Sequence, residues 1–127
     1  MRSILFTFVL LFAAPFAVAQ STEPQKVIAA QIDAFQDDDF DLAFTFASPT
    51  IQSIFLSSEQ FGNMVVNGYP MVWRPKAVRY LDTPLTNRPR LLITDQQGRL
   101  HLLEYDMVQG ADGWRINGVQ IVPASGA

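Results

Sequence analysis

Few residues in this chain have types and spacing suited to acid–base chemistry. In residues 99–108, written RLHLLEYDMV, the alternation of a strand places His101 and Tyr105 on one face. His101 is the only histidine of the chain, and an imidazole titrates near neutral pH. The pair could therefore act as a general base beside a phenolic donor. A lone histidine next to a turn is also commonly solvated or held in a purely structural hydrogen bond, and that alternative stays open.

A second group of candidates lies in residues 68–75, written GYPMVWRP. Tyr69, Met71 and Trp73 offer apolar surface, and Arg74 offers a cation, so these four residues are candidates for ligand binding. Each proline disfavours helical geometry in the residue before it, which predicts a stiff, irregular joint. In the alternative interpretation the stretch serves packing: Trp73 fills the edge of the core, and Arg74 pairs with a carboxylate or stacks on an aromatic ring.

Composition excludes several kinds of site. A chain with no cysteine and one histidine cannot build the usual zinc sets, a disulfide or a cysteine nucleophile. The acidic run at residues 37–41, DDDFD, lacks the glycine and the distal glutamate of a calcium-binding loop. A net charge of −3 without a basic run argues against a nucleic-acid partner. We therefore expect no metal, no cofactor and no nucleic acid.

The N-terminus has the layout of a secretory signal peptide. Arg2 precedes an apolar run at residues 4–14, and Ala17 and Ala19 are the small residues that a signal peptidase recognises. The run is shorter than the roughly 20 residues that a membrane-spanning helix needs. We expect cleavage after Ala19 and a periplasmic or secreted protein with no membrane span in the mature chain. Because the chain has no cysteine, a bacterial periplasm is the favoured compartment.

The remaining residues predict one domain at 26–123, with a flexible leader at 20–25 and a tail at 124–127. A helical period begins at Lys26, and the first helix is expected to end near Gln36. Three further helices are predicted, with their N-caps at Asp38 or Asp39, at Ser48 and at Ser57. Gly68 is the expected C-cap of the fourth. In the third helix, Ile51, Ile54 and Phe55 are expected to form a buried stripe.

The period changes to that of strands after Pro75. Four strands are predicted at residues 77–81, 90–95, 99–108 and 113–122, with turns at DQQG and GADG. Gly118 is expected to mark a bulge or a close approach of backbone. Helices followed by an antiparallel meander predict an α+β fold in which the helices pack on one face of a curved four-stranded sheet.

The segments QIDAFQDDDFDLAF, FASPTIQSIF, GYPMVWRP and GWRINGVQIVP resemble the uncharacterised bacterial family called domain of unknown function 4864. More loosely, the chain is similar to the cone-shaped proteins of the nuclear transport factor 2-like superfamily. This resemblance implies a bent sheet wrapped around helices with a pocket at the open end, and pairing of such sheets implies a homodimer. It brings no catalytic residues, because the fold alone does not decide the function.

Two functions from different classes follow. The first is a non-catalytic module that binds a small apolar or amphipathic molecule, or a protein, at a pocket edged by Tyr69, Trp73 and Arg74. The second is an isomerase, dehydratase or hydrolase of small molecules that uses His101 and Tyr105. A carboxylate base as in steroid isomerases has no good candidate, because Asp106 lies on the strand face opposite Tyr105 and Asp33 flanks the apolar side of its helix.

Overall fold

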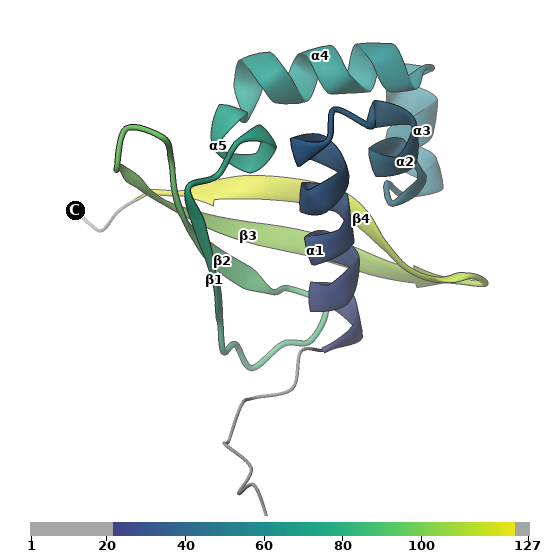
Figure 1. Ribbon diagram of the computed structural model, residues 1–127. Coiled ribbons are helices and arrows are strands. Elements are labelled where there is room, and N and C mark those ends of the chain that lie inside the picture. Colours follow the sequence, from purple (N-terminus) through teal and green to yellow (C-terminus); the bar gives the residue numbers. More distant parts are fainter. Residues whose placement is uncertain (1–21, 124–127) are drawn as a thin grey trace, which may run out of the picture.

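Residues 22–123 are described by a computed structural model, in which helices precede strands along the chain (Figure 1). The helices are α1 (Glu23–Gln36), α2 (Phe40–Thr45), α3 (Pro49–Phe55), α4 (Ser58–Gly68) and α5 (Pro70–Trp73). The strands are β1 (Ala77–Leu81), β2 (Arg90–Thr94), β3 (Leu100–Gly110) and β4 (Gly113–Val122). The predicted signal peptide and the tail at 124–127 lie outside the described residues. Within residues 22–123, no helix has the length and apolar character needed to cross a membrane.

The strands form one sheet in the order β1-β2-β3-β4, and every neighbouring pair is antiparallel. The helices cover one face of it (Figure 1), so the predicted α+β fold is confirmed. Both predicted turns are present and have a glycine where the backbone has a positive φ, at Gly98 (85°) and Gly113 (111°). A side chain is disfavoured in that region, and the glycines therefore place these hairpins where the sequence predicted them.

Helix α1 begins at Glu23, three residues before the predicted start. Thr22 and Gln25 form a capping box, in which the Thr22 hydroxyl accepts from the Gln25 N–H at 3.2 Å and the Gln25 side chain accepts from the Thr22 N–H at 3.1 Å. Pro24 lies in the first turn, where its missing N–H has no helical partner to lose. The prediction of a flexible leader was thus wrong for residues 23–25, which belong to the helix.

The later helices begin at the predicted caps. The side chains of Asp39, Ser48 and Ser57 each accept a hydrogen bond from a backbone N–H of the first turn. The end of α4 differs by one residue from the prediction, because Gly68 is still helical and Tyr69 is the C-cap. Residue Tyr69 is also the N-cap of α5, which makes one helical turn within the joint that was predicted to be irregular.

The apolar face of α3 is not buried, which contradicts the prediction. None of its residues is buried, and the Ile54 side chain is 61% exposed. The helix ends at Phe55, and its C-cap Leu56 is 79% exposed and has a positive φ of 66°. Periodicity correctly predicted which residues of α3 share a face, but that face is turned toward a cavity and not into close-packed core.

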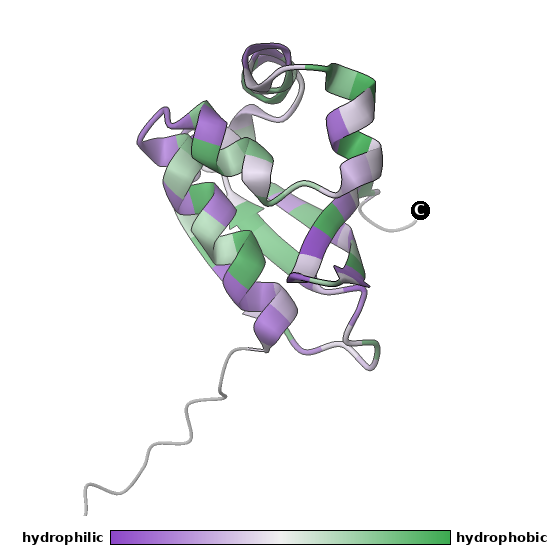
Figure 2. Cartoon of the chain, turned by 90° about the vertical axis from the view of Figure 1, so that its right-hand side faces the viewer, coloured by the Kyte–Doolittle hydropathy of each residue, from purple (hydrophilic) through white to green (hydrophobic). Residues whose placement is uncertain are grey.

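The core lies between α1 and the inner face of the sheet. Ile28, Ile32 and Phe35 of α1 are buried, as are alternate residues of β2 and β3. Those strand residues are Leu91, Ile93, Leu103, Tyr105 and Met107. Figure 2 shows the mixture of hydrophobic and hydrophilic residues along each helix that is typical of helices burying one side. The alternation predicted for the third strand is therefore confirmed.

A bulge in β4 anchors the start of α3. The pairing of β3 with β4 shifts between Asp106 and Met107, so that Asn117 is the extra residue beside Gly118. The Asn117 side chain accepts a hydrogen bond from the Ser48 hydroxyl at 2.8 Å, and the Ser48 N–H donates to the Ile116 carbonyl at 2.8 Å. The bulge predicted at Gly118 is thus present, and it holds the first turn of α3 against the sheet.

Candidate functional site

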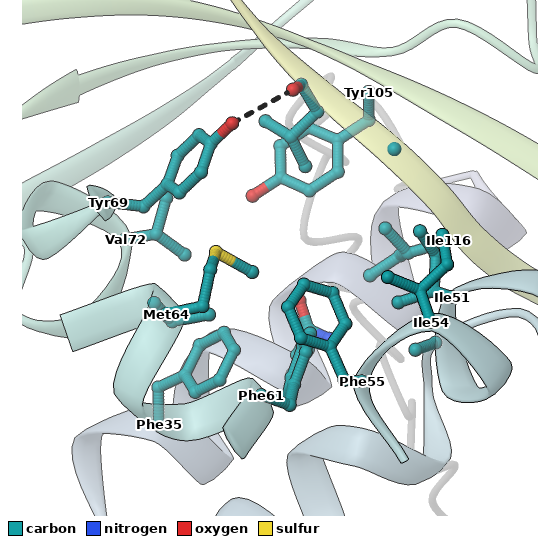
Figure 3. Close-up of a pocket in the computed structure, with 15 residues that line it drawn as sticks. Phe35, Ile51, Ile54, Phe55, Phe61, Met64, Tyr69, Val72, Tyr105 and Ile116 are labelled. Atoms are coloured by element: carbon teal, nitrogen blue, oxygen red, sulfur yellow. Dashed lines mark hydrogen bonds between the residues drawn. The ribbon is translucent and has the colours of Figure 1, made fainter. Parts of the chain in front are cut away.

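A cavity of 320 Å³ lies among α1, α3, α4 and β4 (Figure 3). We call it the apolar cavity, because most of the side chains that line it are hydrophobic. Its aromatic lining residues are Phe35, Phe55, Phe61, Tyr69 and Tyr105. Its aliphatic lining residues include Ile51, Ile54, Met64, Val65, Ile116 and Val119. None of the described residues that line it carries a charged side chain.

The position of α3 explains why this space is not filled. The helix is tied to β4 at its N-terminus through Ser48, and it ends at Phe55. Its apolar residues line one wall of the cavity (Figure 3). Phe55 packs edge-on against Phe61 of α4, with the ring centroids 5.7 Å apart, whereas Ile54 is left largely uncovered. Because Ile54 is largely exposed, this side of the cavity opens to solvent. The cavity thus has an apolar wall and an apolar entrance.

Tyr105 of β3 places a hydroxyl group at the inner end of the apolar cavity. Its side chain is fully buried, and its hydroxyl has no hydrogen-bond partner among the described residues. In Figure 3 the hydroxyl points toward the side of the cavity formed by Tyr69 and Met64. Burial raises the pKa of Tyr105 well above its ordinary value, because the phenolate would have no water around it. The group is therefore a protonated donor at any physiological pH.

The other polar side chains at this cavity donate to backbone carbonyls. The Tyr69 hydroxyl donates to the Val119 carbonyl at 3.4 Å, a long hydrogen bond drawn as a dashed line in Figure 3. The Gln31 amide is buried and donates from Nε2 to the Ala43 carbonyl at 3.1 Å. Each of these side chains thus supplies a hydrogen bond to a backbone carbonyl of a neighbouring element. Tyr105 differs from them, since its hydroxyl serves no other described residue.

A second space, which we call the polar pocket, lies between α5 and the β2–β3 turn. Its volume is 420 Å³, and its lining includes Trp73, Arg74, Asp95, Arg99 and His101. The His101 ring nitrogen Nε2 lies 2.8 Å from Asp95 Oδ2. The hydrogen bond from His101, with those from the backbone N–H groups of Arg99 and Gln97, lowers the pKa of Asp95. The same carboxylate thus orients the histidine and closes the turn.

Trp73 and Arg74 are held together by one carboxylate. The Trp73 indole donates to Asp38 Oδ1 at 2.9 Å, and Arg74 Nη2 lies 3.0 and 3.1 Å from the two oxygens of Asp38. Arg74 also stacks on the Trp73 ring, 4.3 Å from its centroid, and donates to the Phe35 carbonyl at 2.9 Å. The hydrogen bond from Trp73, and after it the hydrogen bonds and positive charge of Arg74, lower the pKa of Asp38. The pairing and stacking of the packing interpretation are both observed.

The structure divides the predicted ligand-binding residues between two spaces. Tyr69 lines the apolar cavity, whereas Met71, Trp73 and Arg74 line the polar pocket. Their role in binding stays a prediction, but the four residues do not edge a single pocket. Successive side chains of the short helix α5 point in different directions, so the side chains of residues 68–75 cannot all face the same pocket.

His101 and Tyr105 are not brought together in one site. They share a face of β3, as predicted, but Tyr105 is at the apolar cavity and His101 is at the polar pocket beside Asp95. The structure therefore gives no single space in which both could act on one substrate. Within residues 22–123 no three histidine, cysteine, aspartate or glutamate residues come close enough to hold a metal ion.

Most residues of the apolar cavity were not candidates from the sequence. Phe55, Phe61 and Ile116 lie at positions that a helical or strand period assigns to ordinary core. Tyr105 did carry a signal, since a tyrosine hydroxyl on the buried face of a central strand needs a partner. The sequence does not indicate whether that partner is another residue of the chain.

The comparisons with known proteins give one match. The family described as domain of unknown function (DUF4864) matches residues 17–127, so the chain belongs to this family. No curated protein and no solved structure matches the chain.

Proposed function

We propose that this member of the DUF4864 family is a non-catalytic binding protein that holds a small apolar molecule in the apolar cavity. The observation that carries the proposal is the cavity itself: 320 Å³ lined by aromatic and aliphatic side chains from both layers of the fold. Sites for small molecules are typically concave, mostly apolar and largely preformed, with a few polar groups that fix orientation. The hydroxyl group of Tyr105 is such a group here.

The size of the cavity supports a ligand over a packing fault. Ligand sites are typically clefts of about 300–1,000 Å³, and this solvent-open apolar space of 320 Å³ lies at the lower end of that range. An engineered apolar cavity of about 150 Å³ binds benzene, and the space here is roughly twice as large. Two fused six-membered rings are therefore the scale of molecule that fits it.

Two further parts of the proposal rest on the sequence. The signal peptide predicted at residues 1–19 supports action in the periplasm or outside the cell. The order of helices followed by an antiparallel meander is that expected of a nuclear transport factor 2-like cone, and we propose membership of that superfamily. In such a cone, the space between the helices and the sheet is where a ligand would lie.

The alternative function, an enzyme using His101 and Tyr105, receives less support from the geometry. The two residues line different spaces, and His101 is engaged with Asp95, whose carboxylate also accepts from two backbone N–H groups of a turn. An aspartate–histidine pair that closes a hairpin has a structural role without any substrate. We therefore propose the binding function and not a catalytic one.

The test uses naphthalene as the probe and two variants of β4. Val119 lines the cavity, whereas Ile121, two residues along the same strand, does not line it and is 48% exposed. In equilibrium dialysis read by naphthalene absorbance, we expect binding to the wild type and to Ile121→Phe, and loss of binding in Val119→Phe, because the added ring fills the cavity.

Retention of naphthalene by Val119→Phe, or no binding to the wild type, would contradict the proposal. Native mass spectrometry of the protein purified from its own periplasm then identifies the natural occupant. We expect a retained mass that is lost on denaturation, and that is reduced in Val119→Phe but not in Ile121→Phe.

A further inference from the structure

Resting on the proposed function, we infer that the part of the ligand enclosed by the apolar cavity is uncharged and has one hydrogen-bond acceptor, and that Tyr105 donates to this acceptor. The observation that carries the inference is the Tyr105 hydroxyl, which is buried at the cavity and has no partner among the described residues. Buried polar groups are almost always hydrogen-bonded in native proteins, and an exception calls for an explanation. A bound ligand supplies the missing partner.

The ligand atom at this position is an acceptor, because the group that faces it is a donor. Tyr105 is buried at the sheet face of the cavity, and its pKa is raised, so the hydroxyl keeps its proton. The other hydroxyl group at the cavity, that of Tyr69, already donates to the Val119 carbonyl. A ketone, ester or ether oxygen would accept from Tyr105, whereas a hydrocarbon of the same shape would leave the hydroxyl unpaired.

The enclosed part of the ligand is uncharged, because the lining of the cavity offers nothing to balance a charge. No lysine, arginine, histidine, aspartate or glutamate lines it among the described residues. Transfer of an unpaired carboxylate or ammonium group into such surroundings costs far more than one hydrogen bond returns. Arg74, the cation that the sequence suggested for ligand binding, lines the polar pocket and is committed to Asp38.

Access to the hydroxyl depends on side chains that can move. Tyr105 has no exposed surface, so a ligand atom reaches the hydroxyl only when a neighbour in the wall gives way. Met64 lines the cavity from α4 and is only partly buried. The unbranched thioether of methionine adapts to irregular space more readily than other apolar side chains. We therefore expect a change of the Met64 side-chain conformation to give the ligand access to the Tyr105 hydroxyl.

Three probes of matched shape test the inference. They are 2-acetylnaphthalene, which has a carbonyl acceptor; 2-isopropenylnaphthalene, its hydrocarbon isostere; and 2-naphthoate, its anionic counterpart. In equilibrium dialysis with the wild type, we expect the ketone to bind about threefold to tenfold more tightly than the alkene, the range that one neutral hydrogen bond gives. We expect 2-naphthoate to bind at least about tenfold more weakly than the ketone.

Two conservative variants assign the effect to one hydroxyl. In Tyr105→Phe the affinities for ketone and alkene should become equal, with the alkene bound at least as tightly as by the wild type. In Tyr69→Phe the preference for the ketone should persist, because that hydroxyl donates to the Val119 carbonyl. A ketone preference that survives in Tyr105→Phe would refute the role of Tyr105.

The remaining outcomes separate this inference from the proposed function. Equal binding of ketone and alkene by the wild type would overturn the inference and leave the cavity's binding function standing. Binding of 2-naphthoate as tight as that of the ketone would overturn the claim that the enclosed part of the ligand is uncharged. If none of the three probes binds to the wild type, both the inference and the proposed function fail.

Discussion

Replacing Tyr105 with phenylalanine should make the ligand-free protein more stable. The substitution removes one hydroxyl and keeps the ring that packs in the core. A buried hydroxyl without a partner costs about 1–3 kcal/mol of desolvation that folding does not recover. The hydroxyl here is buried and unpaired among the described residues, so its removal should raise the free energy of unfolding by at least about 1 kcal/mol. Most core substitutions act in the opposite direction.

The measurement is urea unfolding of the purified, ligand-free protein at pH 7. In a thermal melt of a domain of this size, the same gain of 1 kcal/mol in unfolding free energy would raise the Tm by about 4–8 °C. The slope of unfolding free energy against urea should not change, because the surface exposed is the same. Tyr69→Phe is the matched control and should be neutral or slightly destabilised, because it loses the 3.4 Å hydrogen bond to Val119. If Tyr105→Phe is less stable than the wild type, the hydroxyl has a partner and the reasoning about the cavity is wrong.

Three other predictions test the local physics of the fold. Because hydrogen bonds from Trp73 and Arg74 lower the pKa of Asp38, their stabilisation is present at neutral pH and lost on acidification. Asp38→Asn should therefore be less stable than the wild type at pH 7, with the difference narrowing below about pH 4 in thermal melts. In urea unfolding, Leu56→Gly should raise the free energy of unfolding by about 1 kcal/mol, because glycine tolerates the positive φ of 66°. Leu56→Ala should show no such increase. In the same assay, Gly62→Ala should lower the free energy of unfolding by about 1 kcal/mol, because the added Cβ would lie 2.6 Å from the Phe40 ring. An unchanged urea midpoint would mean that the ring moves aside freely.

Local chemistry made most of the fold predictable. The caps at Asp39, Ser48 and Ser57 act through hydrogen bonds within one turn, so neighbours in sequence are enough to predict them. Gly98 and Gly113 likewise mark their turns because the backbone requires a positive φ there. The start of α1 was missed because residues 22–25 were interpreted as a polar leader, although Thr22 and Gln25 form a capping box and Pro24 lies in the first turn of the helix. Each of these features depends on residues a few positions apart.

The candidate site was less predictable, because it depends on side-chain contacts that the local sequence pattern does not specify, one of them between residues 36 positions apart. Arg74 pairs with Asp38, and His101 pairs with Asp95, and the residue types alone allowed these pairings without specifying them. The strand period correctly placed His101 and Tyr105 on one face of β3. A strand rises about 3.3 Å per residue, however, so residues four positions apart are far enough separated to line two different spaces.

The apolar cavity shows where periodicity stops being informative. The stripe of Ile51, Ile54 and Phe55 has the same pattern whether the opposite wall touches it or stands several ångströms away. The tie between Ser48 and the bulge at Asn117, across 69 residues of sequence, fixes one end of α3 against the sheet. If this tie maintains the cavity, Asn117→Ala should weaken naphthalene binding as well as stability, although it touches no bound probe; unchanged affinity in a folded Asn117→Ala would show that the side chains of the wall alone hold the cavity open.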